Sequence, residues 1–219
     1  MTAEMNLLVE GAATLGLSID EGQIERFSAF MLELSKWNRK INLTAIKGER
    51  EIIVKHLLDS LTLPAHVNIQ GKVLDIGSGA GFPSIPLSII RPDLAIMSVD
   101  AVQKKILFQK HIARTLKLDN FTAVHARAEA LTNVSRERYD FILSRAFSSL
   151  KAFVELSLPL LAGDGKIVAM KGAGGKEEAQ KSEFELAGLM MTIEQVIEFG
   201  LPVTGDNRSL IVLSKVNRI

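Results

Sequence analysis

The stretch that most constrains the fold is Lys72–Ile90, where a short apolar segment leads through a glycine-rich turn into a second apolar segment. Residues 72–76 read K-V-L-D-I and predict a buried strand. Residues 77–81 read G-S-G-A-G, and glycine lets the backbone turn sharply and approach a ligand closely. Pro83 and Pro86 follow, where a first helical turn tolerates the missing N–H. A strand, a glycine turn and a helix in this order are typical of a nucleotide-binding α/β unit.

The spacing of the glycines limits which class of ligand the turn can bind. Dinucleotide-binding folds use G-x-G-x-x-G, which, counted from Gly77, requires a glycine where this chain has Phe82. The chain instead reads D-x-G-x-G-x-G from Asp75 to Gly81. Asp100 follows at the end of the next apolar run, where a carboxylate can accept two hydrogen bonds from the hydroxyls of a ribose.

This combination resembles the S-adenosylmethionine (AdoMet) site of class I methyltransferases. The resemblance implies that the cofactor is bound by Gly77, Gly79, Gly81 and Asp100. The alternative is an ordinary strand–turn–helix corner without a ligand. A nicotinamide-dependent dehydrogenase is disfavoured by the phenylalanine at position 82.

The segments before Lys72 are all predicted to be helical. Their expected ranges are Glu4–Leu15, Glu21–Lys40 and Arg50–Leu63. Asp20 with Gln23 predicts a capping box for the second helix, and Pro64 is expected to end the third. We therefore expect residues 1–66 to form an N-terminal helical extension and residues 67–219 to form the AdoMet-dependent methyltransferase domain.

From Lys72 onward, strands and helices alternate, which predicts a mostly parallel sheet with helices on both faces. Strands are expected near Val73–Ile76, Ala95–Val99, Thr122–Ala126, Tyr139–Ser144, Lys166–Met170, Thr192–Phe199 and Ser209–Lys215. Helices are expected near Phe82–Ile90, Val102–Leu118, Ala128–Asn133, Leu150–Leu161 and Glu177–Gly188. The connection at residues 200–207 fits an antiparallel pair. The predicted fold is α/β, with a seven-stranded sheet whose last strand is antiparallel, which is the Rossmann-like plan of class I methyltransferases.

In open α/β sheets, ligands bind beyond the carboxyl ends of the strands. The residues expected at those ends are 77–82, Asp100, 127–129, Arg145 and 171–172. Three of these five ends carry a cation, at Arg127, Arg145 and Lys171. Cations that converge on one rim of the sheet favour an anionic substrate.

The residue types that the chain lacks exclude several chemistries. Without cysteine there are no disulfides, thiolate zinc sites or cysteine nucleophiles. Methylation at carbon 5 of a pyrimidine through a covalent cysteine adduct is therefore excluded. The four histidines are scattered, so we expect no metal site. No apolar run reaches the roughly 18 residues of a membrane span and no secretory signal is visible, so we expect a cytoplasmic protein without a membrane partner.

The charges are unevenly distributed although the net charge is only +1. Residues 1–33 are acidic, with six acids against one arginine, whereas residues 34–56 carry six cations against two acids. Residues 101–118 carry five cations and no acid, and these include Lys104 and Lys105. The two basic blocks are either a face for a polyanion such as RNA or ordinary solvated helix surface.

The fourth strand end indicates which atom is methylated. Enzymes that methylate exocyclic amines of bases often carry Asp/Asn-Pro-Pro-Tyr there, whereas residues 144–147 read S-R-A-F, with no general base beside them. The target should then already offer a lone pair, as N7 of guanine does. Arg145 is expected to bind guanine O6 or a phosphate, or to form only a surface ion pair. Phe147 or Phe82 would stack on the base, unless Phe147 is a core residue.

The chain resembles the RsmG (GidB) family of bacterial small-subunit ribosomal RNA guanine-N7 methyltransferases over nearly its whole length. The motifs that carry the likeness are W-N at 37–38, N-L-T at 42–44, H-L-L-D-S at 56–60, D-I-G-S-G-A-G-F-P at 75–83, R-A-E at 127–129, S-R-A at 144–146, M-K-G at 170–172 and Arg208. The N-L-T and H-x-x-D-S motifs are the more discriminating, because methyltransferases in general lack them.

The resemblance implies AdoMet as cofactor and S-adenosylhomocysteine as product. It implies that Gly77, Phe82, Ala128, Glu129 and Arg145 contact the cofactor. Residues expected to face the substrate or act in catalysis are Arg145, His56, Asp59 and Lys171, and residues expected to bind RNA are Lys104, Lys105, Arg127, Phe147 and Arg208. The implied target is one guanine in the decoding-region hairpin of 16S rRNA, as free RNA or in a small-subunit particle. We expect a monomer.

The chain departs from the family pattern at Ala80, Ser84 and Ala101, and the last of these lacks a hydroxyl near the expected ribose. Two other functions use the same fold. One is an AdoMet-dependent methyltransferase that acts on a small molecule or a protein, because fold does not fix substrate. The other is a non-catalytic RNA-binding module.

Overall fold

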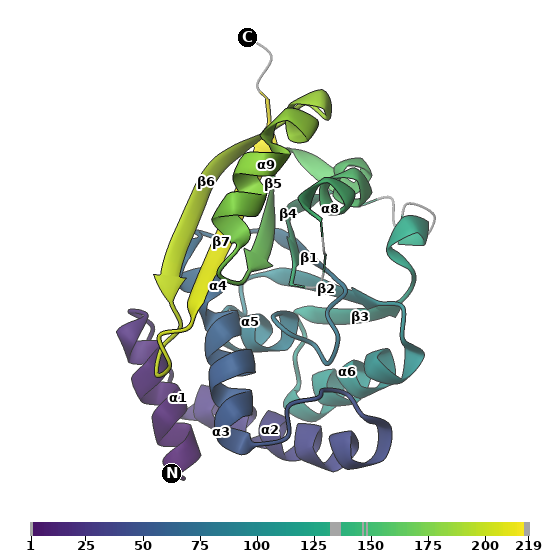
Figure 1. Cartoon of the computed structure of the whole chain (residues 1–219). Coiled ribbons are helices and arrows are strands. Elements are labelled where there is room, and N and C mark those ends of the chain that lie inside the picture. Colours follow the sequence, from purple (N-terminus) through teal and green to yellow (C-terminus); the bar gives the residue numbers. More distant parts are fainter. Residues whose placement is uncertain (1, 132–136, 146, 148, 217–219) are drawn as a thin grey trace.

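The computed structural model describes residues 2–131, 137–145, 147 and 149–216. Its centre is a seven-stranded sheet in the order β3-β2-β1-β4-β5-β7-β6 (Figure 1). The strands are β1 (Lys72–Ile76), β2 (Ala95–Asp100), β3 (Phe121–His125), β4 (Tyr139–Ser144), β5 (Leu161–Lys171), β6 (Met191–Gly200) and β7 (Asn207–Lys215). Neighbours from β3 to β5 pair in parallel, and β7 is antiparallel to both β5 and β6. The predicted fold class is confirmed.

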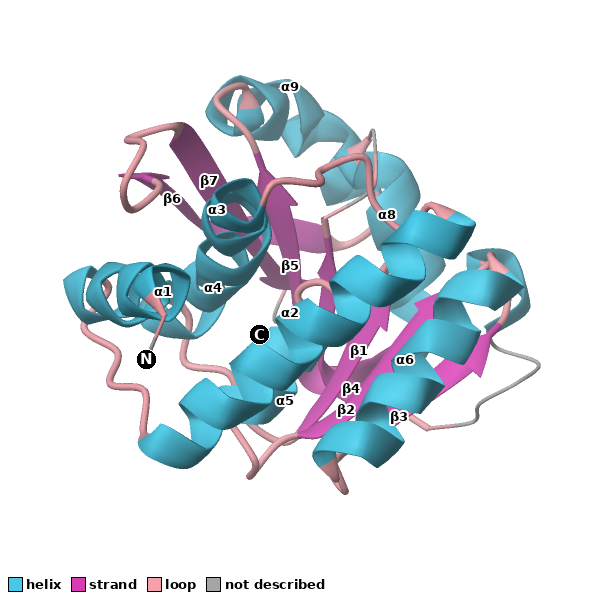
Figure 2. Ribbon diagram, turned by 90° about the horizontal axis from the view of Figure 1, so that it is seen from below, coloured by secondary structure: helices cyan, strands magenta, loops and turns pink. Residues whose placement is uncertain are grey.

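Helices cover both faces of the sheet (Figures 1 and 2). The N-terminal ones are α1 (Ala3–Thr14), α2 (Glu21–Ile41), α3 (Glu49–Ile52), a π-helical segment (Ile53–Leu58) and α4 (Asp59–His66). The later ones are α5 (Ser84–Ile90), α6 (Gln103–Leu116), a 3-10 turn (Ala128–Ala130), α8 (Leu150–Ser157), a 3-10 turn (Leu158–Leu160) and α9 (Gly175–Gly188). In Figure 2, α2, α5 and α6 lie across one face of the sheet, whereas α8 and α9 cover the other.

The N-terminal helices share one hydrophobic core with the sheet. Leu8 of α1, Phe27 and Phe30 of α2 and Leu58 are fully buried in a cluster that also contains Val73 of β1. The predicted capping box fixes the start of α2, since Asp20 and Gln23 each accept the other's backbone N–H. We propose that residues 1–66 are a layer of the same folded body and not an independently stable unit.

Pro64 does not end the third helical stretch as predicted. The helix runs continuously from Glu49 to His66 with Pro64 inside its last turn. Only two residues follow the proline, so its missing N–H removes one bond from the ladder while Val67 N–H still pairs with Leu63 O at 2.9 Å.

The fifth strand begins earlier than expected. Residues 163–165, whose glycines predict a turn, lie inside β5 where the register with β4 shifts between Tyr139 and Phe141. A Cβ on Gly165 would lie 2.8 Å from the Tyr139 carbonyl oxygen, so this glycine permits close approach of two strands. The expected helix at Ala128–Asn133 is a 3-10 turn over its first three residues, and Thr132 and Asn133 lie outside the described residues.

The strand order reverses between β1 and β4. β1 has β2 on one side and β4 on the other, so the loops after β1 and β4 leave the sheet side by side. This is the position at which open α/β sheets bind ligands.

Candidate active site

The glycine turn after β1 lies at the centre of the candidate site. Gly77, Gly79 and Gly81 all have positive φ, at 77°, 62° and 91°, which glycine adopts without strain. Gly77 N–H and Ser78 N–H donate to Val99 O, so the turn is bonded to the end of β2. A Cβ on Gly81 would lie 2.3 Å from Ile85 Cδ1, whereas the nearest atom to a Cβ on Gly79 would be Lys105 Nζ at 4.0 Å. Gly81 therefore serves the close packing of the turn on its own helix, and Gly77 and Gly79 lie at the surface where a ligand can approach.

Asp100 lies beside this turn at the end of β2. Its Oδ2 accepts the Gly79 N–H at 2.9 Å and its Oδ1 accepts the Val102 N–H at 2.8 Å. Lys105 Nζ is 4.0 Å from the same carboxylate. A carboxylate has about four acceptor positions, so two remain for a ligand. The backbone bonds hold the side chain in the place that the sequence predicts for a ribose-binding carboxylate.

A cavity of about 400 Å³ opens beside Asp100 at the carboxyl ends of β1 to β4. Its lining includes four predicted cofactor residues, namely Gly77, Asp100, Ala128 and Glu129. Arg127 and Phe147, which were expected to bind RNA, line the same cavity, and the Phe147 ring also stacks on Phe153 with centroids 5.1 Å apart. Ile76, Val99, Ala101 and Ala126 complete the wall. A wall that combines apolar side chains with the buried carboxylate of Asp100 suits a planar base that carries a hydroxylated sugar.

A second cavity of about 250 Å³ lies on the other side of the turn, and Gly77 lines both cavities. Gly79, Phe82, Lys105 and Arg145 line it, together with Thr44 and His56 from the N-terminal helical part. Phe82 is buried, with the His56 ring stacked on it at a centroid distance of 4.5 Å. Its ring is thus covered by the protein and offers no free face to a base. Lys104 lies on the exposed start of α6, outside the described lining.

Arg145, at the end of β4, is held by the π-helical segment. Its Nη1 donates to Asp59 Oδ2 at 3.2 Å and to the Lys55 carbonyl at 3.3 Å. Its Nη2 donates to His56 Nδ1 at 3.2 Å. Its Cζ lies 5.6 Å from the centroid of the Phe82 ring, within range of a cation–π contact. The guanidinium is therefore fixed from several sides.

His56 is a neutral member of this network. Burial, and secondarily the Arg145 cation, lower the pKa of His56 to about 4. Because a guanidinium only donates, Nδ1 must be the acceptor, and the ring proton lies on Nε2. That proton points to Thr44 Oγ1, 2.9 Å away. Asn38 Oδ1 in turn accepts the Leu43 and Thr44 N–H groups. The motifs at 37–38, 42–44 and 56–60 thus form one chain of hydrogen bonds that ends on Arg145.

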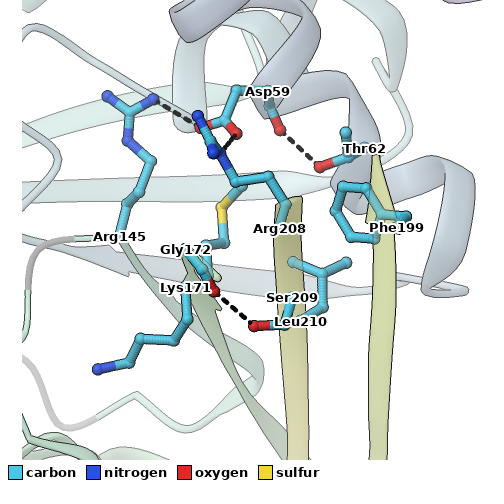
Figure 3. A pocket seen from close by; sticks show the side chains of 10 residues that line it. Asp59, Thr62, Arg145, Lys171, Gly172, Phe199, Arg208, Ser209 and Leu210 are labelled. Carbon is cyan, nitrogen blue, oxygen red and sulfur yellow. Dashed lines mark hydrogen bonds and ion pairs between the residues drawn. The ribbon is translucent and has the colours of Figure 1, made fainter. Parts of the chain in front are cut away.

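Asp59 joins two arginines that are far apart in the sequence (Figure 3). Its Oδ1 accepts the Arg208 Nε–H at 2.9 Å while its Oδ2 accepts from Arg145. The carboxylate is buried, and each arginine side chain is about a quarter exposed. These three residues line a cavity of about 180 Å³ together with Thr62, Met170, Lys171 and Phe199. Predicted site residues from three parts of the chain are therefore brought together.

Lys171, for which a catalytic role is predicted, forms contacts within the fold. Its Nζ donates to the Phe147 carbonyl at 2.8 Å and to Glu178 Oε1 at 2.9 Å. Figure 3 shows its amino group turned away from Asp59. Glu178 also accepts the Leu150 N–H, so this ion pair joins β5, α8 and α9. Glu178 carried no signal in the sequence, whereas Thr44 was part of a motif although no role was predicted for it.

Asp75 lies beneath the glycine turn and is fully buried. Its Oδ2 accepts a hydrogen bond from Ser84 Oγ, and its Oδ1 has no partner among the described residues. Burial raises the pKa of Asp75 to about 7, and the hydrogen bond from Ser84 only partly offsets this.

In the part of the chain that the structure describes, no helix is long and apolar enough to cross a membrane.

Comparisons with known proteins show what this chain is similar to. Residues 23–210 match the family model GidB, rRNA small subunit methyltransferase G. The chain is 51% identical over 210 residues to the ribosomal RNA small subunit methyltransferase G of Geotalea uraniireducens, covering 96% of both chains. It is 53% identical over 212 residues to the protein of that name from Geobacter metallireducens, covering 97% of this chain and 96% of the relative.

Among solved structures, the fold is similar to that of M. jannaschii TYW2 in complex with AdoMet. The TM-score is 0.52, over 68% of this chain and 69% of the other, at 14% sequence identity. An identity this low supports a shared fold only.

Proposed function

This chain belongs to the GidB family of rRNA small subunit methyltransferase G proteins, and on that premise we propose that it methylates N7 of one guanine in the decoding-region hairpin of 16S rRNA. The family predicted from the sequence motifs is confirmed. The chain is an AdoMet-dependent rRNA methyltransferase, as its motifs predict. The nucleotide, the atom and the roles of individual residues are our proposal.

The observation that carries the proposal is that the titratable groups around Arg145 are already engaged. His56 is neutral, with Nδ1 bonded to Arg145 and Nε2 bonded to Thr44. Both carboxylate oxygens of Asp59 accept from arginines. Neither group is free to remove a proton from a substrate amine. N7 of guanine requires no deprotonation, because it presents a lone pair in the plane of the ring. His56 and Asp59 therefore act as positioning residues for Arg145.

The cavity beside Asp100 fits the cofactor. Asp100 retains acceptor positions for the ribose hydroxyls, and the apolar walls near Ala128 and Phe147 suit the faces of adenine. Glu129 lies at the exposed rim. AdoMet supplies an electrophilic methyl group on a positively charged sulfur. Gly77 lines both cavities, so a methyl group near this glycine would face the smaller one.

Transfer requires an in-line approach of the base nitrogen to the methyl group, and orientation supplies most of the rate. The N7 lone pair forms the new C–N bond as the C–S bond breaks, and sulfur keeps that electron pair in S-adenosylhomocysteine. No proton moves. Arg145 contacts guanine O6 or a phosphate, since a bidentate contact to O6 and N7 would block the reacting atom. The negative charge of Asp59 offsets the two arginines, so positive charge that develops on the base is less disfavoured.

The test uses labelled AdoMet and a hairpin RNA of the decoding region. The expected result is label in 7-methylguanosine. A matched hairpin with 7-deazaguanosine at the target position should accept no label, because the reacting nitrogen is replaced by carbon. Label that persists in the 7-deaza RNA, or that enters only protein or small solutes, would contradict the proposal.

We further propose that the protein acts as a monomer on 16S rRNA in the cytoplasm. Parallel assays with free 16S rRNA and with small-subunit particles would identify the preferred substrate form. Light scattering of the protein alone should give the mass of one chain, and a stable dimer would contradict the monomer.

A further inference from the structure

A third cavity lies outside the two that meet at the glycine turn. It has a volume of about 410 Å³ and is lined by residues from the end of α2, from the loop that leads to α3 and from α3 itself. Figure 2 shows the path of that loop from α2 to α3. Ser35, Asn38, Arg39, Asn42 and Lys47 are among the lining residues of the cavity, so its wall is polar and carries two cations. We call it the cap cavity. The proposed methyl transfer gives it no role.

The wall of the cap cavity is fixed by hydrogen bonds. Asn38 Oδ1 accepts the Leu43 N–H at 2.7 Å and the Thr44 N–H at 2.9 Å, which holds the start of the loop against α2. Asn42 ends α2 in the left-handed conformation, with φ of 48°. The cap cavity lies on one side of this loop, and Leu43 and Thr44 line the smaller of the two cavities at the glycine turn. The two cavities are therefore adjacent.

The cations around the cap cavity are not neutralised by the protein. Arg39 and Lys47 are exposed, as are Lys40 and Arg50, and none of the four forms an ion pair among the described residues. Lys36 and Lys55, the other two cations of the basic block, pair with Glu33 and Glu51 and so account for two nearby acids. Four charges remain available to an external anion.

Helix stability explains only two of these four cations. Arg39 and Lys40 lie in the last turn of α2, where a cation complements the helix dipole. Arg50 lies in the first turn of α3 and Lys47 just before it, where the dipole disfavours a cation. Arg39 and Lys47 nevertheless line the same cavity, although the two helix ends have opposite preferences for a cation.

We propose that the cap cavity binds the phosphate backbone of the RNA substrate, with Arg39 and Lys47 as the phosphate contacts. Arginine binds phosphate through its planar fork of donors, and lysine binds it as a point charge. An RNA strand whose target base enters the cavity beside Arg145 then passes over the Asn42–Thr44 loop. The first turn of α2, at the other end of this helix from Arg39, is acidic and disfavours the strand there. This inference rests on the proposed function.

The test compares two double variants that remove the same charge. The first is Arg39→Gln with Lys47→Gln, and the matched control is Arg26→Gln with Lys181→Gln. Arg26 and Lys181 are exposed and form no ion pair among the described residues, and Arg26 lies about 20 Å from Arg39 along α2. KM for the hairpin and the salt dependence of its binding are measured for both, with AdoMet affinity and thermal midpoint as controls for folding.

The cap variant should raise KM for RNA about tenfold and make the slope of log K against log salt shallower by roughly 0.7–0.9 for each lost phosphate contact. A charge-retaining variant, Arg39→Lys with Lys47→Arg, should keep most of the wild-type slope. Equal effects of the cap variant and the control, or a wild-type slope in the cap variant, would overturn the site. If the wild-type protein transfers no methyl group to RNA, the proposed function fails, whereas a cap-dependent salt slope would still support the site.

Discussion

His56 Nδ1 accepts a hydrogen bond from the Arg145 guanidinium over 3.2 Å. This contact connects the N-terminal helices to the carboxyl end of β4, and it requires one tautomer of the imidazole. The Arg145 donor selects that tautomer, and the Thr44 hydroxyl accepts the hydrogen bond from Nε2–H.

Thr44→Val should therefore reduce kcat about tenfold, because a buried ring N–H without a partner costs about 1–3 kcal/mol and the His56 ring loses a contact that holds it against Arg145. Thr44→Ser retains the hydroxyl and should restore most of the rate. Steady-state methyl transfer at saturating RNA measures both variants. If serine and valine reduce kcat equally, Thr44 acts through packing and not through the hydrogen bond.

Asp59→Ala should destabilise the protein by about 1–3 kcal/mol and abolish most of the activity. The change leaves Arg145 and Arg208 near each other without their shared carboxylate. Urea unfolding and methyl transfer measure the two effects. Asp164→Ala, which alters an exposed carboxylate in β5, is the matched control and should change neither. Wild-type activity in Asp59→Ala would show that the bridge is dispensable.

Asp100→Ala should weaken AdoMet binding by about 1–3 kcal/mol, since it removes acceptors for the ribose and frees the Gly79 N–H. Isothermal titration calorimetry measures the affinity, and the thermal midpoint without ligand separates this loss from unfolding. Asp119→Ala, at an exposed carboxylate before β3, serves as the control. Unchanged affinity in Asp100→Ala would rule out the assigned ribose contact.

Asp75 should make the free energy of unfolding fall as pH rises. Its pKa is about 7 in the folded state against an ordinary value of 3.8. The favourable contribution is therefore complete below about pH 4 and is lost as pH rises to about 7, with a size on the order of 4 kcal/mol.

Asp75→Asn is neutral at every pH and should remove this loss. His56, whose pKa is lowered, makes the opposite contribution, because stability rises with pH between about 4 and 6.5. Urea unfolding of the variant and of the wild-type protein is compared between about pH 4 and pH 7. An identical pH dependence in both would mean that Asp75 is ionised throughout.

Leu8→Ala should destabilise the whole protein by about 2–5 kcal/mol, because Leu8 is fully buried in the core shared by α1 and the sheet. Unfolding followed by Trp37 fluorescence and by circular dichroism should show one coincident transition in the variant as in the wild type. Two separated transitions would instead identify residues 1–66 as a domain that unfolds alone.

Much of the fold follows from local sequence. Short apolar segments located the seven strands, although β5 begins earlier than predicted. Asp100 lies beside the glycine turn because the turn follows β1 and Asp100 ends the neighbouring parallel strand β2. Two predicted interruptions, a helix end at Pro64 and a turn at residues 163–165, were wrong for different reasons. Pro64 is tolerated in a last helical turn, and Gly165 lies in a strand because the Tyr139 carbonyl approaches it closely.

The site was predicted less completely, because its geometry joins distant parts of the chain. Family motifs indicated Asp59, Arg145 and Arg208, but their shared bridge requires three elements to meet in space. The Lys171–Glu178 pair depends on how α9 packs against β5 and has no local signature. Phe147 was expected either to stack on RNA or to pack in the core, and its place in the cavity beside Asp100 depends on the path of the loop after β4.

The π-helical segment has a consequence for the lengths of related sequences. Within it the Asp59 N–H bonds to the Val54 and His56 carbonyls, whereas a regular α-helix would pair it with Lys55, whose carbonyl instead accepts from Arg145. Such a segment is an α-helix with one residue inserted. Deletion of a single residue here would return that carbonyl to the helical ladder and rotate His56 by about 100° relative to Asp59. Gaps should therefore be absent from this stretch in any relative that uses the same arginine, even where its side chains vary.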